Sequence, residues 1–219
     1  MGFNIAIDGP SGAGKSTIAK LVAKENGFIY VDTGAMYRAI ALYFLDHGLE
    51  ISDAKDVIGH LPEIKVGIDY ENGMQQVLLG EEVVTDRLRA EAVGNIASHI
   101  AGIPEVREHL LAIQKDLAKT QNVVMDGRDI GTQILPDADV KIFLTASVDT
   151  RARRRFLELQ EKGISCNLEE VKQDIADRDE RDTKREVAPL KQAEDAILVD
   201  SSEMTIPEVV ETISKYVKG

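Results

Sequence analysis

The sequence predicts an α/β fold, a doubly wound parallel sheet of five strands with a small antiparallel α+β insert and a helical lid. Three observations predict it. A glycine-rich loop follows the first apolar run, five short apolar runs alternate with helix-length segments, and one stretch interrupts this alternation with a hairpin pattern. The chain has 219 residues, which is enough for one such domain with an insert and does not require two independent domains.

The predicted strands are short continuous apolar runs, typical of buried parallel strands. They lie at residues 3–7, 28–31, 123–125, 140–144 and 196–199. Between them, the segments 16–26 and 35–47 repeat apolar residues at helical spacing. This alternation indicates right-handed crossovers, and a ligand is expected where the parallel strands end.

Residues 9–16 form a phosphate-binding pattern, G-x-x-x-x-G-K-[ST], between the first predicted strand and the first predicted helix. Glycines let the backbone N–H groups turn toward a phosphate, and the helix that begins near Lys15 directs its positive dipole end at the same anion. Lys15 adds a full charge at the β- and γ-phosphates, and the Ser16 hydroxyl can ligate Mg²⁺. Glycine-rich turns also occur without any ligand, but the lysine and serine favour a P-loop of the NTPase type.

Residues 49–103 break the alternation of strands and helices. The segments 64–70 and 75–79 alternate apolar and polar residues around Asn72-Gly73, a strong hairpin signal, and a third short strand is expected at Val83 and Val84. A helix pattern follows from about residue 86 to 101, and Pro104 begins the next helix. The residues expected on the inner face of the 86–101 helix are Leu88, Ala92, Ile96 and Ile100, or their neighbours.

The domain organisation follows from this interruption. We expect a core formed by residues 1–48 and 104–219, a lid at about 148–185 within it, and an inserted acceptor-binding subdomain at 49–103. The insert could be a decoration. Its place between two core strands on the ligand edge favours a cover for the substrate.

Polar residues follow two of the predicted strands on the ligand edge. After the second strand, Thr33 is expected to cap the next helix and Arg38 to reach a phosphate. After the third, Asp126 is a candidate partner of Mg²⁺ through water, and Arg128 is a second phosphate ligand. Turns with solvated charges are the alternative for either segment, and their convergence with the P-loop argues against it.

Two arginine clusters lie on predicted helices. Arg151, Arg154 and Arg155 share one face, where like charges repel, so either Glu158 and Glu161 balance a solvated face or a mobile lid closes over a triphosphate.

The second cluster, Arg178, Arg181 and Arg185, also falls on one stripe. A salt-bridged surface helix, with Asp174 and Asp177 as partners, is the alternative there.

The formal net charge of −12 at pH 7 argues against general binding to nucleic acid or anionic membranes, which both need a positive surface field. The single cysteine, Cys166, can form neither an internal disulfide nor a multi-cysteine zinc site. There is no apolar run of about 20 residues and no signal-peptide pattern, so we expect a cytoplasmic protein. No long apolar heptad or stripe indicates an obligate dimer, so we expect a monomer.

Taken together, these motifs resemble those of the bacterial-type cytidylate kinases in the nucleoside monophosphate kinase superfamily, over essentially the whole chain. The segments that carry the resemblance are 7–15, 32–38, 97–98, 104–107, 126–129, 159–163, 178–182, 188–190 and 200–202. One departure is Lys115, where an arginine commonly follows Gln114 in the family. The P-loop alone is shared by many activities, whereas the combination is specific.

The resemblance implies phosphoryl transfer from ATP to CMP or dCMP with Mg²⁺, in pyrimidine nucleotide metabolism. It implies that ATP is bound by Gly9, Pro10, Ser11, Gly12, Ala13, Gly14, Lys15, Ser16, Thr17, Arg151 and Arg154. The residues implied for catalysis are Lys15, Arg128, Asp129, Arg154 and Arg178.

The acceptor nucleotide is implied to be bound by Thr33, Arg38, Ser98, Arg107, Arg128, Asp129, Asp182 and Arg185. Arg38 and Arg128 would hold the monophosphate. Ser98, Arg107 and Asp129 would hold the cytosine, and Asp182 with Arg185 the sugar.

Two alternatives share the P-loop. A kinase for another monophosphate or a small metabolite such as shikimate would give no reason for an insert carrying Ser98 and Arg107. A nucleotide-binding switch module would need no second set of arginines for an acceptor.

Overall fold

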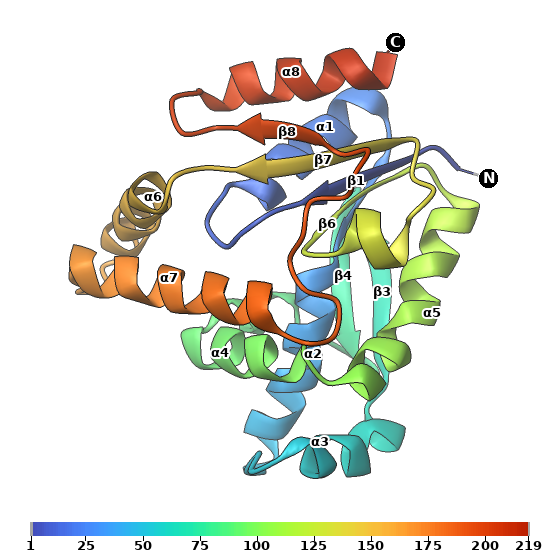
Figure 1. Ribbon diagram of the computed structural model, residues 1–219. Coiled ribbons are helices and arrows are strands. Elements are labelled where there is room, and N and C mark those ends of the chain that lie inside the picture. The colour runs from blue at the N-terminus through green and yellow to red at the C-terminus, as the bar shows by residue number, and fades with distance from the viewer. Residues whose placement is uncertain (1, 219) are drawn as a thin grey trace.

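The computed structural model describes residues 2–218 and contains a five-stranded, fully parallel sheet with the strand order β2-β6-β1-β7-β8 (Figure 1). The strands are β1 (Asn4–Asp8), β2 (Ile29–Asp32), β6 (Val123–Gly127), β7 (Val140–Thr145) and β8 (Ile197–Asp200). All five predicted strands are confirmed. The strand order reverses at the central strand β1, so the P-loop after β1 lies at the switch point, where α/β sheets bind ligands.

Every strand extends one or two residues beyond the predicted apolar run. The added residues are polar or glycine, and they align across the sheet, with Asp8 beside Gly127 and Asp32 beside Asp126 in the strand register. Hydrophobicity marks the buried part of a parallel strand, whereas backbone pairing continues into the edge where side chains face a ligand. The carboxyl edge of the sheet is therefore built from polar residues.

Helices cover both faces of the sheet, as expected for a doubly wound fold. On one face, α1 (Lys15–Asn26) packs beside α8 (Ile206–Lys218) over Ile5, Ile7 and Val124. On the other, α2 (Thr33–Asp46) and α5 (Pro104–Thr120) pack with Ala6 and Met125. The alternation of odd and even strand residues between the two apolar clusters follows from the period of two in a β-strand.

The insert forms a lobe on α2 (Figure 1). It contains α3 (Ala54–His60), the antiparallel strands β3 (Val66–Glu71), β4 (Met74–Leu79) and β5 (Glu82–Val83), and α4 (Glu91–Ile100). The hairpin prediction is confirmed. Asn72 and Gly73 both have positive φ, at 51° and 76°, as a tight two-residue turn between twisted strands requires.

Two details of the insert differ from the prediction. The single helix expected over 86–101 is a 3₁₀ segment, Thr85–Arg89, followed by α4, because Ala90 is extended with ψ at 141°. The buried face of α4 therefore shifts, so that Val93 and Ala97 lie inside and Ala92 is exposed. The short helix α3, with its capping box between Asp53 and Asp56, was not predicted.

The segment predicted to be a lid, and called the lid below, is a pair of helices, α6 (Val148–Glu161) and α7 (Leu168–Lys184), which lie at the carboxyl ends of β7 and β8 (Figure 1). They pack on each other through a small apolar cluster of their own, formed by Ala152, Leu159, Val171 and Ile175. This separate cluster distinguishes the lid from the two layers around the sheet. None of the helices within residues 2–218 combines the length and the apolar composition that crossing a bilayer requires.

Candidate active site

The P-loop runs from the end of β1 into α1 and needs its glycines. Gly9 and Gly12 have φ of 150° and 75°, and Gly14, at φ 88°, is the left-handed cap of α1. A Cβ on Gly9 would lie 1.9 Å from the carbonyl oxygen of Leu144 on β7. A larger residue at position 9 would push the loop away from the sheet, so the glycine fixes the loop at the switch point.

Lys15 is buried at the centre of this loop, and its Nζ donates a 2.7 Å hydrogen bond to the carbonyl of Pro10. Burial lowers the pKa of Lys15 well below its usual value, and the neighbouring Arg128 lowers it further, although Asp126, Asp182 and Asp8 oppose this. A buried ammonium beside a guanidinium, with no direct carboxylate hydrogen bond of its own, is a positive site that a bound phosphate would stabilise.

Ser16 and Asp126 lie together, with the Ser16 hydroxyl donating to Asp126 Oδ2 at 3.0 Å and the Tyr30 hydroxyl donating to Oδ1 at 2.9 Å. Burial raises the pKa of Asp126 to about 6, and Asp32 adds to the rise, while Lys15 and the two hydroxyls oppose it. A cation near this carboxylate would relieve that cost. A hydroxyl and a carboxylate are oxygen ligands of the kind that Mg²⁺ prefers, so the pair fits a Mg²⁺ ion held partly through water.

Within residues 2–218, no group of three or more His, Cys, Asp or Glu side chains is arranged to hold a metal ion. A Mg²⁺ ion that takes most of its ligands from phosphates and water does not need such a cluster. The predicted pair of Ser16 and Asp126 is therefore consistent with a metal that arrives with the nucleotide.

The helix after β2 is capped differently from the prediction. Asp32 Oδ1 accepts the Ala35 amide at 2.9 Å and caps α2, while the Thr33 hydroxyl donates to the Asp126 carbonyl at 2.8 Å. The expectation that Thr33 caps the helix was wrong, because β2 ends at Asp32 and the helix begins at Thr33, two residues before its predicted apolar pattern at 35–47. Arg38, one turn along, lies 3.8 Å from Asp32 and remains partly exposed toward the site.

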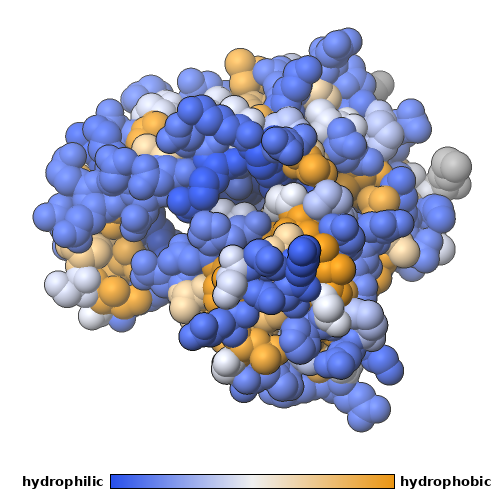
Figure 2. Space-filling model, turned by 60° about the horizontal axis from the view of Figure 1, so that its bottom comes forward, coloured by the Kyte–Doolittle hydropathy of each residue, from blue (hydrophilic) through white to orange (hydrophobic). Residues whose placement is uncertain are grey.

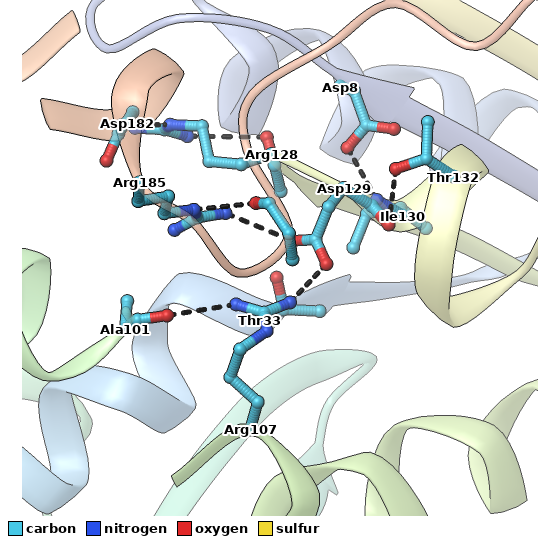
Figure 3. A network of polar contacts seen from close by, with 12 residues as sticks. Asp8, Thr33, Ala101, Arg107, Arg128, Asp129, Ile130, Thr132, Asp182 and Arg185 are labelled. Atoms are coloured by element: carbon cyan, nitrogen blue, oxygen red, sulfur yellow. Dashed lines mark hydrogen bonds and ion pairs between the residues drawn. The ribbon is translucent and has the colours of Figure 1, made fainter. Parts of the chain in front are cut away.

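Asp129 is the centre of a polar network in which side chains from three elements converge (Figure 3). Arg107 of α5 forms an ion pair with its Oδ2 and also donates to the Ala101 carbonyl at 3.1 Å. Arg185, at the end of α7, lies 3.5 Å from its Oδ1. Burial raises the pKa of Asp129, and Arg107, Arg185 and Arg128 oppose the rise. The network therefore joins the insert side, the core and the lid.

A second pair lies beside it. Arg128 Nε donates to Asp182 Oδ2 at 2.8 Å, and this arginine lowers the pKa of Asp182 although burial acts in the opposite direction. Arg178, one turn before Asp182 on α7, is largely buried. Burial lowers the pKa of Arg178 to about 10, and the neighbouring Arg128 and Arg38 contribute. Asp182 balances only part of the charge of these arginines, so a bound anion would stabilise the cluster.

Three buried polar atoms of the predicted site residues have no hydrogen-bond partner among the described residues. They are Ser98 Oγ and Arg185 Nη2 of the predicted acceptor set and Arg178 Nε of the predicted catalytic set, and Arg185 Nη2 makes only the 3.5 Å ion-pair contact with Asp129. An unpaired buried polar group costs about 1–3 kcal/mol, and such groups persist where a ligand completes them. Figure 2 shows an opening between two lobes of the molecule with a mostly hydrophilic rim. The orphaned atoms and the arginine cluster thus indicate an anionic ligand with further hydrogen-bonding groups.

The lid arginines separate into three environments. Arg151 is buried, forms a 2.7 Å ion pair with Asp179 of α7 and donates to the Ser11 carbonyl of the P-loop at 2.9 Å. Arg154 donates to the Ser201 carbonyl, at 2.7 Å, on the loop after β8. Arg155 pairs with Glu158 at the surface, which is the solvated-face alternative. The repulsion expected among these arginines is therefore offset by a different partner for each.

The predicted arginine stripe on α7, formed by Arg178, Arg181 and Arg185, also places its side chains in different environments. Arg181 is exposed, whereas Arg178 and Arg185 face the site. In the part of the chain that the structure describes, no ion pair joins Arg178 to Asp174 or Arg181 to Asp177, so the two pairs expected for a salt-bridged surface helix are not formed.

Sequence reasoning missed Asp8, Tyr30 and Asp179. Asp8 directly precedes the P-loop at the end of a strand, which was an available signal, and Tyr30 lies in a predicted strand facing Asp126. Asp179 lies in the 178–182 segment that carries the resemblance, but its pairing could not be predicted because its partner Arg151 lies on another helix.

Comparison with known proteins gives a consistent result. The family model described as cytidylate kinase matches residues 5–219. The chain is 51% identical over 217 residues to the cytidylate kinase of Shouchella clausii (strain KSM-K16), covering 99% of this chain and 96% of that protein. It is also 51% identical over 211 residues to the cytidylate kinase of Caldicellulosiruptor saccharolyticus, covering 96% and 93%. Among solved structures, an uncharacterized protein from Eubacterium ventriosum matches with a TM-score of 0.56 and 12% identity over 99% of both chains, a likeness of fold alone.

Proposed function

This chain belongs to the cytidylate kinase family, and from that premise we propose that it transfers the γ-phosphoryl group of ATP to CMP or dCMP, yielding ADP and CDP or dCDP. The observation that carries the proposal is the set of orphaned polar atoms on Ser98, Arg178 and Arg185. Ser98 and Arg185 belong to the predicted acceptor set and Arg178 to the predicted catalytic set, and none of the three lies in the P-loop. A module that only binds a nucleotide at its P-loop would have no use for them.

The donor nucleotide binds along the P-loop, from Gly9 to Thr17. Lys15 contributes its charge at the β- and γ-phosphates, and Ser16 with Asp126 would hold Mg²⁺, which neutralises phosphate charge when bound. Arg151 anchors the lid to this loop through the Ser11 carbonyl, and Arg154 lies where it can turn from Ser201 toward the triphosphate.

The transfer needs no dedicated base, because a phosphate oxygen of the acceptor is already an anionic nucleophile at neutral pH. Catalysis then depends on in-line positioning and on stabilising the charge of the transferred group. Arg38 and Arg128 hold the acceptor phosphate, while Lys15 and Arg178 supply positive charge to the transferred phosphoryl. Closure of the lid removes water, which would otherwise hydrolyse ATP.

The acceptor base is selected by hydrogen-bond polarity. A carboxylate at Asp129 accepts from the N4 amino group of cytosine but repels O4 of uracil, and Arg107 with Ser98 can donate to N3 or O2 of cytosine. Asp182 and Arg185 bind the sugar. We also propose that the insert, residues 49–103, covers the acceptor and that the enzyme acts as a monomer in the cytoplasm.

An assay of ADP release over a panel of acceptors tests the function. With CMP, dCMP, UMP, AMP and shikimate at equal concentration, we expect CMP or dCMP to exceed the others by roughly 10²-fold in kcat/KM. Equal rates with every acceptor would indicate a less selective kinase. A rate no higher than ATP hydrolysis without acceptor would indicate a nucleotide-binding module.

A further inference from the structure

Asp8 is a buried carboxylate that the proposed reaction does not use. It ends the central strand β1, directly before the P-loop, and is only 5% exposed. Its two oxygens accept backbone amides from a segment more than a hundred residues away, with Oδ1 2.8 Å from Ile130 N and Oδ2 2.8 Å from Gly131 N. Two charge-assisted hydrogen bonds to adjacent amides hold that segment firmly against the strand.

Those amides begin a short π-helical turn, Ile130–Ile134, whose N-cap residue is Asp129. An aspartate at such a position ordinarily turns its carboxylate back to accept the first free amides of its own turn. Asp129 makes no such hydrogen bond. Asp8 takes its place as the cap, and the Asp129 carboxylate instead faces Arg107 and Arg185 (Figure 3).

We propose that Asp8 is a positioning residue, which fixes the orientation of Asp129 and thereby the preference for a cytosine over a uracil acceptor. This inference rests on the proposed function, because it concerns the same acceptor site. Asp8 itself touches no nucleotide in this scheme. Its two hydrogen bonds decide which of two competing roles, local cap or ligand for the base, Asp129 adopts.

The packing around this turn leaves little freedom for an alternative. A Cβ on Gly131 would lie 3.4 Å from Asp8 Oδ2 and 3.2 Å from Lys141 Cδ, and a Cβ on Gly127 would lie 2.6 Å from Ile130 Cδ1. The turn therefore fits closely between β1, β6 and β7. Because the backbone of Ile130 and Gly131 is closely packed, a change at Asp8 displaces the adjacent Asp129.

The charge state of the Asp8 carboxylate allows both of its oxygens to accept hydrogen bonds. Burial raises the pKa of Asp8 to about 6 and the neighbouring Asp129 adds to the rise, while the amides of Gly131 and Ile130 and the charge of Lys15 oppose it. Lys141 of β7, whose ammonium pairs with Asp195, also faces the same turn. At neutral pH the carboxylate is mostly ionised, so both oxygens accept.

The test is Asp8→Asn in the full chain. Asparagine keeps one acceptor oxygen but presents an NH₂ group to the other amide, so one of the two hydrogen bonds is lost at nearly constant volume. We expect the CMP to UMP ratio of kcat/KM to narrow by about tenfold, with KM for CMP raised and KM for ATP changed by less than about twofold. Asp139→Asn is the matched control, because Asp139 Oδ2 accepts the Asn4 amide, at 2.7 Å, at the opposite end of the same strand.

A double-mutant cycle tests whether Asp8 acts through Asp129. In an Asp129→Ala background, Asp8→Asn is expected to leave the CMP to UMP ratio unchanged, since the residue that it positions is gone. An equal, additive narrowing of the ratio in both backgrounds would overturn the proposal. An unchanged ratio in the single variant, with KM for ATP raised as much as KM for CMP, would also overturn it and make Asp8 a support of the P-loop.

Folding is checked by circular dichroism and by the thermal midpoint. If Asp8→Asn does not fold, Asp8→Ser, whose hydroxyl can still accept one amide, is measured in its place. Loss of folding in both would make Asp8 a structural residue and overturn the proposal. A wild-type enzyme with no preference for CMP would refute the proposed function instead, and this would be seen before any variant is made.

Discussion

The donor and acceptor sides of the site are built in different ways. The donor side is one loop, in which nine consecutive residues from Gly9 to Thr17 carry the glycines, the lysine and the hydroxyls. The acceptor side gathers Arg38 from α2, Arg107 from α5, Asp129 from the turn after β6 and Arg185 from the end of α7. The difference teaches that one loop can form a phosphate site from its local backbone, whereas the proposed acceptor site, for phosphate and base alike, needs side chains that the tertiary fold brings together.

The strongest test of the donor side is Lys15→Ala. We expect kcat to fall by about 10³-fold or more, because the buried ammonium is the main fixed charge at the β- and γ-phosphates. The fold should persist, since the removed charge is buried without a carboxylate hydrogen bond and its neighbour Arg128 repels it. Steady-state kinetics and circular dichroism check both statements, with the exposed Lys24→Ala on the same helix as the control. An unfolded variant would give Lys15 a structural role.

On the acceptor side, Asp129→Ala should lower the activity with CMP. It should also narrow the CMP to UMP ratio of kcat/KM by roughly 10²-fold. Each mismatched polar group in a closed site costs about 1–3 kcal/mol, and two mismatches distinguish uracil from cytosine here. KM for ATP should change little. Loss of activity at a constant ratio would mean that Asp129 acts only by holding Arg107 and Arg185, and that other residues recognise the base.

Two arginine variants in the lid test the region where the donor and acceptor sides meet. Arg185→Ala should raise KM for CMP about tenfold more than KM for ATP, because it removes a contact to the acceptor. Arg154→Ala should chiefly lower kcat, because it removes charge stabilisation in the closed state. The exposed Arg181→Ala on α7 serves as the control. If both variants behave like Arg181→Ala, these arginines belong to the solvated surface.

The last prediction concerns stability, not activity. Burial raises the pKa of Asp126 to about 6 from 3.8, so the folded state binds this proton more tightly than the unfolded state does, and stability falls as the pH rises between about 4 and 6. The loss amounts to about 3 kcal/mol at most. In Asp126→Asn this titration is absent. Urea unfolding at pH 4.5, 5.5 and 7 should show the variant gaining stability relative to the wild type as the pH rises, and parallel curves would contradict the assignment.

The regular elements of the core could be predicted from the sequence because each is encoded by its own residues. Five apolar runs became five parallel strands, and Asn72-Gly73 became the expected hairpin turn. The break of the 85–100 segment at Ala90 could not be predicted, because it depends on how the insert packs in the core and no local pattern records that packing. The helix α3 did carry a local signal that was not used for its prediction, the capping-box spacing of Asp53 and Asp56.

The candidate site shows the same contrast between features encoded by local sequence and features that depend on the tertiary structure. The P-loop is determined by the sequence itself, because its function follows from backbone conformations that its glycines specify locally. Which carboxylate caps the turn after β6, and which is left to face the arginines, was decided by the tertiary structure. Asp129 is adjacent to that turn in the sequence, but Asp8 reaches its amides across 122 positions of chain. Local preference favours the nearer residue, and only the register of β1 beside β6 brings the distant one within hydrogen-bonding distance.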